Sequence, residues 1–221
     1  MSSAPDLSGL TEEEQAELLA LSEAEYSHSP LADFIRQHCP NEPPLPHLSP
    51  LISLIERARR GERVRACLHM PPRHSKTTTI LRGLVWYLMS AQADTCAYAT
   101  YSGEVGWEKS GMARNFALQV GLRLAADSKA KNLWKTPAGG GMYGTGVGGP
   151  LTGRGVDGLM IVDDPFANPE EAMSPVIREK VWKWFNGVVY TRLQKRASVI
   201  VVHTRWHPDD LIGRLLKKNA E

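Results

Sequence analysis

The chain has 221 residues, 42% of them hydrophobic and 23% charged, a composition typical of one medium-sized globular domain with a sizeable core. No apolar run approaches the length of about 18 residues that a transmembrane helix needs, and the N-terminus lacks the basic and then apolar layout of a secretory signal. The three cysteines are odd in number and widely spaced, which argues against a disulfide framework or a C-x-x-C metal site. We therefore expect a cytoplasmic protein without a membrane partner.

The formal net charge of +2 is unevenly distributed along the chain. Residues 1–30 contain seven acidic side chains and no Lys or Arg, so the rest of the chain carries 26 basic and 17 acidic groups, a charge of +9. A basic body behind an acidic leader is compatible with a polyanionic partner. The alternative is that the scattered Lys and Arg side chains only solvate the surface.

The first part of the chain differs in composition from the rest. Thr11 and Glu14 have the spacing of a capping box, and the leucine-rich residues after them favour a short helix. Five prolines between Pro40 and Pro50 exclude a helix interior or a central strand. We predict an N-terminal helical appendage and proline-rich linker at residues 1–44, followed by a compact domain at residues 45–221.

From Ser49 onward, strand and helix patterns alternate. Ser49-Pro50 predicts the N-cap and first turn of a helix that ends near Gly61. Residues 139–155 hold nine glycines in seventeen positions, which predicts loops or a tight hairpin. The alternation favours an α/β fold with a mostly parallel sheet and helices on both faces. Strands are predicted at 65–70, 95–101, 159–162 and 199–202, and helices at 77–90, 105–120, from 175 onward and at 208–217.

The segment between the first predicted strand and the helix at 77–90 has the character of a phosphate-binding loop. Such a loop requires backbone N–H groups at a helix N-terminus, a Lys for the outer phosphates and a Ser or Thr hydroxyl for Mg²⁺. Lys76 and Thr77 occupy the positions of the last two groups. The pattern G-x-x-x-x-G-K-[ST] requires glycine where this chain has Met70 and Ser75, so a basic loop that caps a helix remains an alternative.

Two carboxylates, Asp163 and Asp164, follow the apolar strand at 159–162. In P-loop NTPases an acid at the end of such a strand holds the Mg²⁺ shell, and the next residue orients or deprotonates the attacking water. The alternative is a solvated Asp-Asp-Pro turn. The combination of this strand with the earlier strand–Lys-Thr–helix unit predicts nucleotide hydrolysis.

Two further positions are candidates for contact with the terminal phosphate. Thr204 follows the strand at 199–202, and ligands of a doubly wound sheet bind at the carboxyl ends of its strands. Arg154 lies between two glycines and is the first candidate for an arginine finger that acts on a neighbouring subunit, with Arg73 as the alternative in cis. The alternative is that Thr204 is an ordinary residue at the end of a strand and that Arg154 is an ordinary surface charge.

Two other patterns are weaker. Residues 144–149 match G-x-G-x-x-G, but Pro150 follows them and no helix begins there, which argues against a dinucleotide site. His203 and His207 have the spacing of half a zinc site, but no pair of cysteines accompanies them.

Taken in order, these motifs resemble the large terminase subunit of tailed bacteriophages, the motor ATPase that packages DNA into a capsid. Each segment is modestly specific, and the ordered set, from about residue 45 to 216, is much more so. The resemblance rests on Pro71-Pro72-Arg73-His74-Ser75-Lys76-Thr77, on the run from Gly146 to Gly155, on Ile161-Val162-Asp163-Asp164-Pro165, on Thr191-Arg192-Leu193, on Thr204-Arg205-Trp206-His207 and on Asp209-Asp210-Leu211-Ile212-Gly213.

The resemblance implies an additional-strand P-loop ATPase fold that uses ATP and Mg²⁺. It implies a divergent Walker A motif at residues 71–77, a Walker B motif that ends at Asp163 and a coupling motif around Thr204. Thr77 and Asp163 would hold the metal, and Asp164 would be the catalytic acid, with Thr204 and either Arg154 or Arg73 completing the site. Nucleotide contacts are implied for Pro72, Arg73, His74, Ser75, Lys76, Thr77 and Thr78.

The resemblance also implies partners. These are double-stranded DNA, the portal protein and the small terminase subunit, with subunits that are monomeric alone and form a ring on the portal in the cytoplasm of a bacterial host. Family members normally continue into an RNase H-like nuclease domain, whereas this chain stops at Glu221, so we expect ATPase activity without DNA cleavage. The alternative is a catalytically weak remnant that acts as a binding module for the portal or the small subunit.

Two departures from the family pattern lie within the site. The family usually has glycine at the position of Ser75. A serine can keep the turn if its φ stays negative, with a tighter approach for the phosphate. Many relatives have glutamate at the position of Asp164, whose side chain is one methylene shorter. The role of Asp164 is therefore less firmly implied than that of Asp163.

Overall fold

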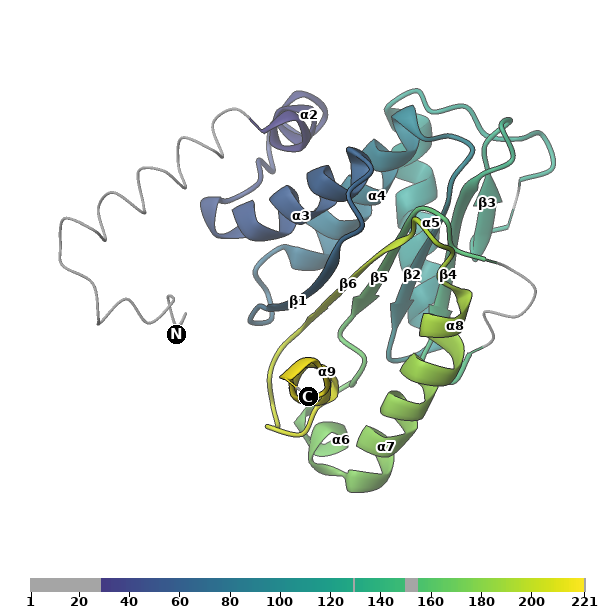
Figure 1. Ribbon diagram of the computed structural model, residues 1–221. Coiled ribbons are helices and arrows are strands. Elements are labelled where there is room, and N and C mark those ends of the chain that lie inside the picture. Colours follow the sequence, from purple (N-terminus) through teal and green to yellow (C-terminus); the bar gives the residue numbers. More distant parts are fainter. Residues whose placement is uncertain (1–28, 129, 150–154, 221) are drawn as a thin grey trace, which may run out of the picture.

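The computed structural model describes residues 29–128, 130–149 and 155–220 (Figure 1). A six-stranded sheet with the order β1-β6-β5-β2-β4-β3 forms its centre. All neighbouring strands are parallel except β3, which pairs antiparallel with β4. The predicted mostly parallel α/β sheet is thus confirmed. The strands are β1 (Arg65–His69), β2 (Thr95–Thr100), β3 (Leu133–Lys135), β4 (Gly141–Gly146), β5 (Leu159–Asp163) and β6 (Ser198–His203).

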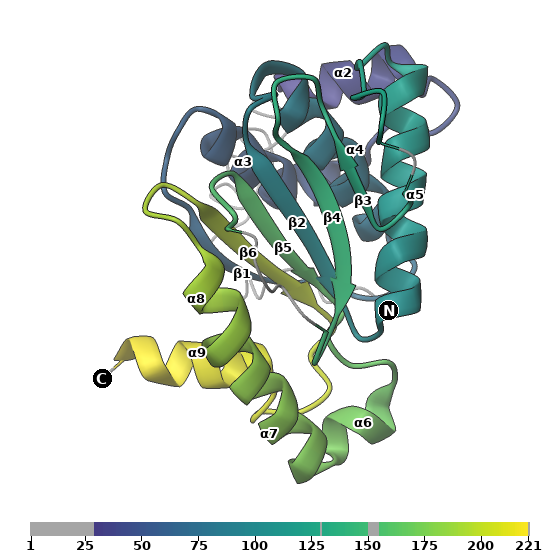
Figure 2. The same cartoon turned by 90° about the vertical axis from the view of Figure 1, so that its right-hand side faces the viewer.

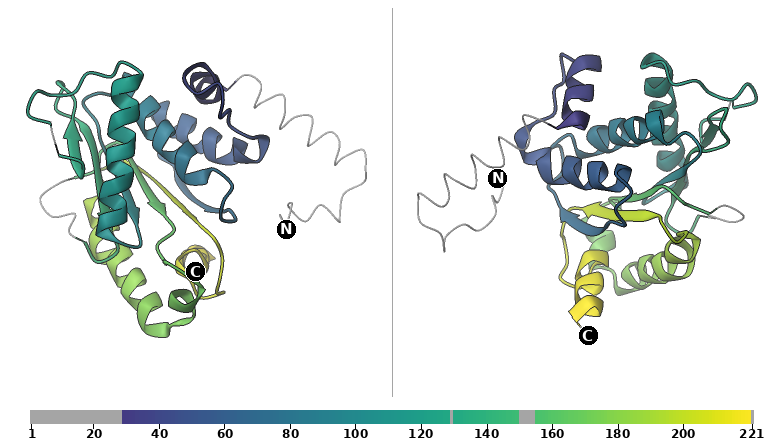
Figure 3. Two further views of the ribbon diagram at one scale, coloured as in Figure 1. Left: turned by 180° about the vertical axis from the view of Figure 1, so that it is seen from behind. Right: turned by 45° about the horizontal axis from the view of Figure 1, so that its top comes forward.

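Helices cover both faces of the sheet, as predicted (Figures 2 and 3). The N-terminal helices α2 to α5 lie on one face, and the helices from α6 to α9 lie on the other. The helical elements are α2 (Pro30–His38), a 3₁₀ turn η1 (Pro46–Leu48), α3 (Ser49–Arg59), α4 (Lys76–Ser90), α5 (Gly103–Gln119), α6 (Pro169–Met173), α7 (Pro175–Trp184), a π-helical segment η2 (Phe185–Val189), α8 (Tyr190–Arg192) and α9 (Leu211–Ala220).

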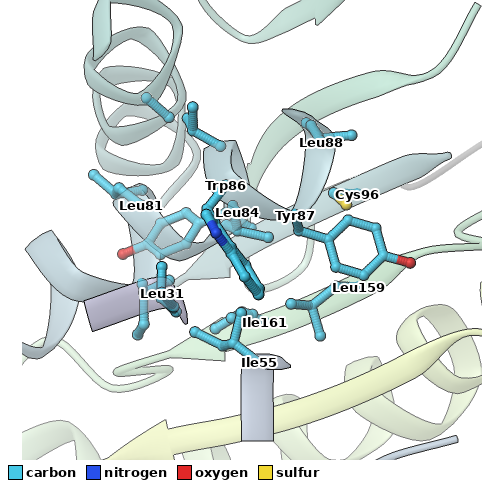
Figure 4. Packing of buried hydrophobic residues seen from close by; sticks show 14 of the residues in the cluster. Leu31, Ile55, Leu81, Leu84, Trp86, Tyr87, Leu88, Cys96, Leu159 and Ile161 are labelled. Atoms are coloured by element: carbon cyan, nitrogen blue, oxygen red, sulfur yellow. The ribbon is translucent and has the colours of Figure 1, made fainter. Parts of the chain in front are cut away.

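The strands divide their side chains between two hydrophobic clusters because successive residues of a strand point to opposite faces. On β5, Leu159 and Ile161 belong to the cluster beneath α3 and α4. Met160 and Val162 belong to the cluster beneath α7 and α9. Figure 4 shows the first cluster, in which Leu159 and Ile161 lie close to Ile55 of α3. This two-sided burial explains why β5 reads as a continuous apolar run.

Helix α2 packs against the same core as α3 and α4. Leu31 and Ile35 are fully buried in the first cluster, and the Ser29 hydroxyl accepts a hydrogen bond from the Ala32 N–H at the start of the helix. The Ser29 hydroxyl also donates to Glu56 of α3 over 2.6 Å. The domain boundary after residue 44 stays a prediction, and the capping box at Thr11 lies outside the described residues.

Several predicted element boundaries shift by a few residues. Ser49 is the first residue of α3, with Leu48 at the N-cap, because the 3₁₀ turn η1 leads directly into the helix. The helix predicted from Pro175 onward is confirmed, and the Ser174 hydroxyl accepts from the Ile177 N–H at its start. Within the described part of the chain, no helix is both long and apolar enough to span a bilayer.

The glycine-rich segment is where the structure departs most from the sequence prediction. It forms the predicted hairpin only in part, through β3 and β4, and β4 is also a fully buried parallel neighbour of β2. The missing side chains let α5 lie directly on the strand. A Cβ at Gly106 would lie 2.2 Å from the Thr145 carbonyl oxygen, and one at Gly144 would lie 2.1 Å from the Gly106 carbonyl oxygen.

Strand β6 lies between β1 and β5 in the sheet, although it comes last in the chain. In the registers, His69 of β1 pairs with His203 of β6, and Val202 of β6 pairs with Asp163 of β5. The carboxyl ends of these three strands therefore meet at one edge of the sheet.

The contact between α5 and β4 can be tested with one methyl group. We expect Gly106→Ala to lower the free energy of unfolding by about 2–3 kcal/mol, because the added Cβ meets backbone that cannot move aside. Gly187→Ala is the control, since a Cβ at that helical glycine meets nothing within 4 Å, and it should be neutral or stabilise by up to about 1 kcal/mol. Chemical denaturation measures both, and equal stabilities of the two variants would contradict the packing argument.

Candidate active site

The site lies where β1, β6 and β5 end. The loop after β1 leads into α4, which begins at Lys76, so Lys76 and Thr77 lie in its first turn. Asp163 is the last residue of β5, and Thr204 follows the last residue of β6. Each side chain is carried to this edge by a buried element.

Thr77 and Asp163 are in direct contact. The Thr77 hydroxyl donates a hydrogen bond of 2.6 Å to Oδ2 of Asp163, whose side chain is only 1% exposed. The other carboxylate oxygen, Oδ1, accepts no hydrogen bond from the described residues and lies 4.0 Å from Nζ of Lys76. Two side chains that the sequence predicts to share one metal ion therefore lie close enough to do so.

Lys76 lies between the two aspartates and is 5% exposed. Its ammonium group forms an ion pair with Oδ2 of Asp164, which is 30% exposed. Oδ1 of Asp164 accepts a hydrogen bond of 3.2 Å from the Thr204 N–H, and the Thr204 hydroxyl donates to the carbonyl oxygen of Met70 over 3.1 Å. The structure thus joins Lys76, Thr77, Asp163, Asp164 and Thr204 in one network, while their chemical roles stay predictions.

The loop that precedes α4 is held in place by η1. The His74 ring nitrogen Nδ1 lies 2.7 Å from the Pro72 carbonyl oxygen, and the His74 carbonyl oxygen lies 3.2 Å from Nε2 of His47. The two imidazole rings meet edge to face with centroids 5.4 Å apart. Pro72 and Arg73 are exposed, and Thr78, after Thr77 in the first turn of α4, is half-buried.

The condition of a negative φ at Ser75 is not met. Its φ is +58°, and that of Arg73 is +63°, both in the left-handed region that favours glycine. The turn from the loop into α4 requires this conformation at Ser75, which directly precedes the helix. Asp164 has a φ of +44°, so the strained residues gather around the site. Of the two candidates for an arginine finger, Arg73 is exposed on the loop, and Arg154 lies outside the described residues.

The turn after β6 is built by residues that the terminase resemblance includes. Arg205 binds the buried carboxylate of Asp210 over 2.7 Å, and the same carboxylate accepts from the Gly213 N–H over 2.9 Å. A Cβ at Gly213 would lie 1.9 Å from the Pro208 carbonyl oxygen, so the turn requires glycine there. These contacts fix the segment that carries Thr204, and they give Arg205, Asp210 and Gly213 a structural role.

Sequence reasoning missed two residues of β2. The Tyr98 hydroxyl donates to Oδ2 of Asp163 over 2.9 Å, and the Thr100 hydroxyl donates to the Asp164 carbonyl oxygen over 3.3 Å. No sequence signal marks them, because tyrosine and threonine are common in strands for their packing alone. Only the parallel pairing of β2 with β5 brings them to the aspartates.

Burial perturbs the titration of Asp163. Burial, followed by the charge of Asp164, raises the pKa of Asp163 from its ordinary value of 3.8 to about 6, while Lys76, Thr77 and Tyr98 oppose the change. A raised pKa means that the folded protein holds this proton between about pH 4 and pH 6, where the unfolded chain has lost it. The stabilising contribution of the protonated form is therefore lost as the pH rises through that window.

The donor set fits Mg²⁺. A hydroxyl and a carboxylate are the oxygen ligands that Mg²⁺ takes, and it commonly keeps few protein ligands and completes its shell with water and substrate phosphates. Oδ1 of Asp163, a buried acceptor without a hydrogen bond from any described residue, would gain a partner from the cation. The described residues contain no cluster of three or more His, Cys, Asp or Glu that could hold a metal by itself. The ring of His203 has a structural role, because its Nε2 accepts a hydrogen bond from the Ile212 N–H.

The cost of the buried charge predicts that Asp163→Asn stabilises the protein. The amide can still accept from Thr77 and Tyr98, so we expect the free energy of unfolding at pH 7 to rise by about 1–3 kcal/mol. The gain should shrink toward pH 4, where the wild-type carboxyl is protonated in the folded state. Denaturation at both pH values measures this, with the exposed Asp127→Asn as control, and a loss of stability at pH 7 would contradict it.

The left-handed backbone at Ser75 predicts a second stabilising change. Ser75→Gly removes the conformational strain, so we expect a gain of about 1 kcal/mol and a rise in Tm of about 2–4 °C. Ser53→Gly, inside α3, is the matched control and should lower stability by a few tenths to about 1 kcal/mol. Thermal unfolding measures both, and a drop in Tm for Ser75→Gly would show that the serine side chain outweighs the strain.

Comparison with known proteins agrees with this architecture. No protein-family model and no curated protein matches the chain. Among solved structures, the crystal structure of the HK97 bacteriophage large terminase superposes on this chain with a TM-score of 0.57 at 16% sequence identity, covering 86% of this chain and 40% of that one. This chain thus spans less than half the length of that protein. At this identity the similarity establishes the fold: the chain has a terminase-like α/β fold.

Proposed function

We propose that this chain is the ATPase module of a terminase-like motor that hydrolyses Mg-ATP to drive double-stranded DNA into a procapsid. The observation that carries the proposal is the contact between Thr77 and Asp163, 2.6 Å from Oγ1 to Oδ2, with the Lys76 ammonium group beside it. These groups come from two elements 86 residues apart in the sequence. Thr77 supplies the hydroxyl, Asp163 the carboxylate and Lys76 the cation that a nucleoside triphosphate site needs.

The topology supports the same proposal. An additional strand, β6, separates the strand that leads into the loop, β1, from the strand that ends in the acids, β5. A strand inserted between these two strands is the feature that gives the additional-strand P-loop class its name. The loop of residues 71–77 would then be a divergent Walker A motif, and Asp163 the end of the Walker B motif.

In this proposal the nucleotide phosphates replace Asp164 as the partner of Lys76. Lys76 is buried and already paired with Asp164, so an incoming phosphate takes over an existing ionic contact. Asp164 is then free to accept a hydrogen bond from the attacking water, for which its partial exposure leaves room. The Thr204 N–H, bonded to Oδ1 of Asp164, would transmit the rearrangement to β6 and to the turn before α9.

Thr77 and Asp163 would hold the metal in the same proposal. When bound, Mg²⁺ neutralises charge on the phosphate oxygens. The Thr77 hydroxyl is in contact with the Asp163 carboxylate, and Oδ1 of that carboxylate has no hydrogen bond from the described residues, so one ion would draw on both side chains. Arg154 of a neighbouring subunit, or Arg73 of the same chain, would complete the charge neutralisation.

The proposed partners follow from the terminase resemblance and from the charge of the chain. They are double-stranded DNA, the portal protein and the small terminase subunit, with a homo-oligomeric ring assembled on the portal. The body of the chain, with its charge of +9, suits a polyanion. A single subunit should hydrolyse ATP slowly, and assembly should accelerate it if Arg154 acts on the next subunit.

A catalytically weak binding module is the second candidate. The side chain of Ser75, in the place of the motif glycine, and the ion pair that occupies Lys76 both favour it, since each works against phosphate entry. Calorimetric titration with Mg-ATP separates the two candidates. Binding heat supports the ATPase proposal, whereas its absence at high protein concentration leaves the binding module.

Removal of the Lys76 ammonium group tests the ATPase proposal. We expect Lys76→Ala to lower the rate of phosphate release by about 10²–10³-fold, because no other buried cation among the described residues contacts this pair of aspartates. Lys183→Ala is the control, since Lys183 is exposed and pairs with Glu179 on α7, and it should retain the parent rate. Hydrolysis by Lys76→Ala as fast as by the parent would contradict the assignment.

A further inference from the structure

We infer that Tyr98 is a positioning residue that keeps the Asp163 carboxylate in the orientation needed to bind a divalent cation, an inference that rests on the proposed function. Tyr98 lies on β2, paired with Ile161 of β5, and is 1% exposed. Its ring belongs to the first hydrophobic cluster, so the side chain is fixed by packing. Its hydroxyl reaches the end of the neighbouring strand and donates to Asp163 over 2.9 Å.

The two oxygens of the Asp163 carboxylate have different environments. Oδ2 accepts from two hydroxyls, that of Thr77 over 2.6 Å and that of Tyr98 over 2.9 Å. Oδ1 accepts from no described residue and lies 4.0 Å from Nζ of Lys76. Two donors on one oxygen fix the rotation of the carboxylate, and they leave the other oxygen available for a cation.

Tyr98 and Thr77 differ in what happens to them when a cation binds. The oxygen of Thr77 is itself a proposed ligand, so its hydrogen bond to Asp163 competes with its contact to the metal. Tyr98 is not a proposed ligand, because it is 1% exposed and its hydroxyl contacts Oδ2, the oxygen that already carries the Thr77 bond. Tyr98 is therefore the donor that can hold Asp163 both before and after the cation arrives.

Other metal sites indicate how much cation affinity the loss of the Tyr98 hydroxyl should cost. Groups that orient a ligand without touching the metal typically change metal affinity by about 10–100-fold when they are removed. Tyr98→Phe removes the hydroxyl and keeps the ring in the core. We therefore expect it to weaken cation-dependent nucleotide binding and to leave cation-independent binding unchanged.

The chain offers a closely matched control. The Tyr87 hydroxyl donates to Oδ2 of Asp94 over 2.8 Å, and Tyr87 is 5% exposed, so Tyr87→Phe deletes a buried Tyr–Asp hydrogen bond of nearly the same geometry. Asp94 directly precedes β2, at its amino end, whereas the site lies at the carboxyl ends of the strands. A purely structural contribution should appear in both variants.

The experiment is calorimetric titration of the full chain with a non-hydrolysable ATP analogue, with Mg²⁺ present and with Mg²⁺ removed by EDTA. We expect Tyr98→Phe to bind the analogue about tenfold or more weakly than the parent with Mg²⁺ and equally in EDTA. Tyr87→Phe should match the parent in both. Replacement of Tyr98 by 4-aminophenylalanine, which restores a donor at the same place, should recover most of the lost affinity. Thermal unfolding of each variant verifies that it is folded.

The outcomes separate the two proposals. If the parent shows Mg²⁺-dependent binding and Tyr98→Phe retains all of it, Tyr98 has no positioning role, and the proposed function stands. An equal loss in both phenylalanine variants, or an equal loss with and without Mg²⁺, likewise assigns Tyr98 a structural role only. If the parent itself binds no analogue in the presence of Mg²⁺, the proposed function fails, and the role of Tyr98 fails with it.

Discussion

The buried carboxylate of Asp163 constrains everything around it. A charge that is 1% exposed is costly unless donors and an opposite charge compensate for it. The structure supplies two hydroxyls on one oxygen and the ammonium group of Lys76 near the other. Even so, burial and Asp164 keep the pKa of Asp163 well above its ordinary value. The fold tolerates this cost at one edge of the sheet, which is typical of a site selected for chemistry.

Backbone strain is concentrated at the same edge. Within the described part of the chain, the residues other than glycine with a positive φ are Arg73, Ser75 and Asp164. Arg73 and Ser75 lie on the loop that leads to Lys76, and Asp164 belongs to the network itself. Each such residue costs of order 1 kcal/mol or more and persists only where the surroundings determine it. Here the surroundings are the turn into α4 and the ion pair between Lys76 and Asp164. Strain and buried charge thus identify one site by two independent measures.

The sheet positions these groups through contacts far from them. The glycines of α5 and β4 let helix and strand backbones touch, and β4 in turn flanks β2, which carries Tyr98 and Thr100. On the other side, Asp210 and Gly213 fix the turn after β6, and with it the N–H of Thr204 that binds Asp164. The geometry of the site is therefore a property of the whole sheet and its two helical layers.

The α/β class, the positions of the main strands and helices, and the candidate residues at their ends could be predicted from the amino-acid sequence, because alternation, apolar runs and helix starts are local patterns. Local patterns could not locate β4, whose glycines resemble a loop until α5 packs on them, nor the left-handed conformation of Ser75. They also could not find Tyr98, since it reaches Asp163 only across the pairing of β2 with β5. Strand order and contacts between distant segments depend on tertiary packing, so they are visible in the folded chain alone.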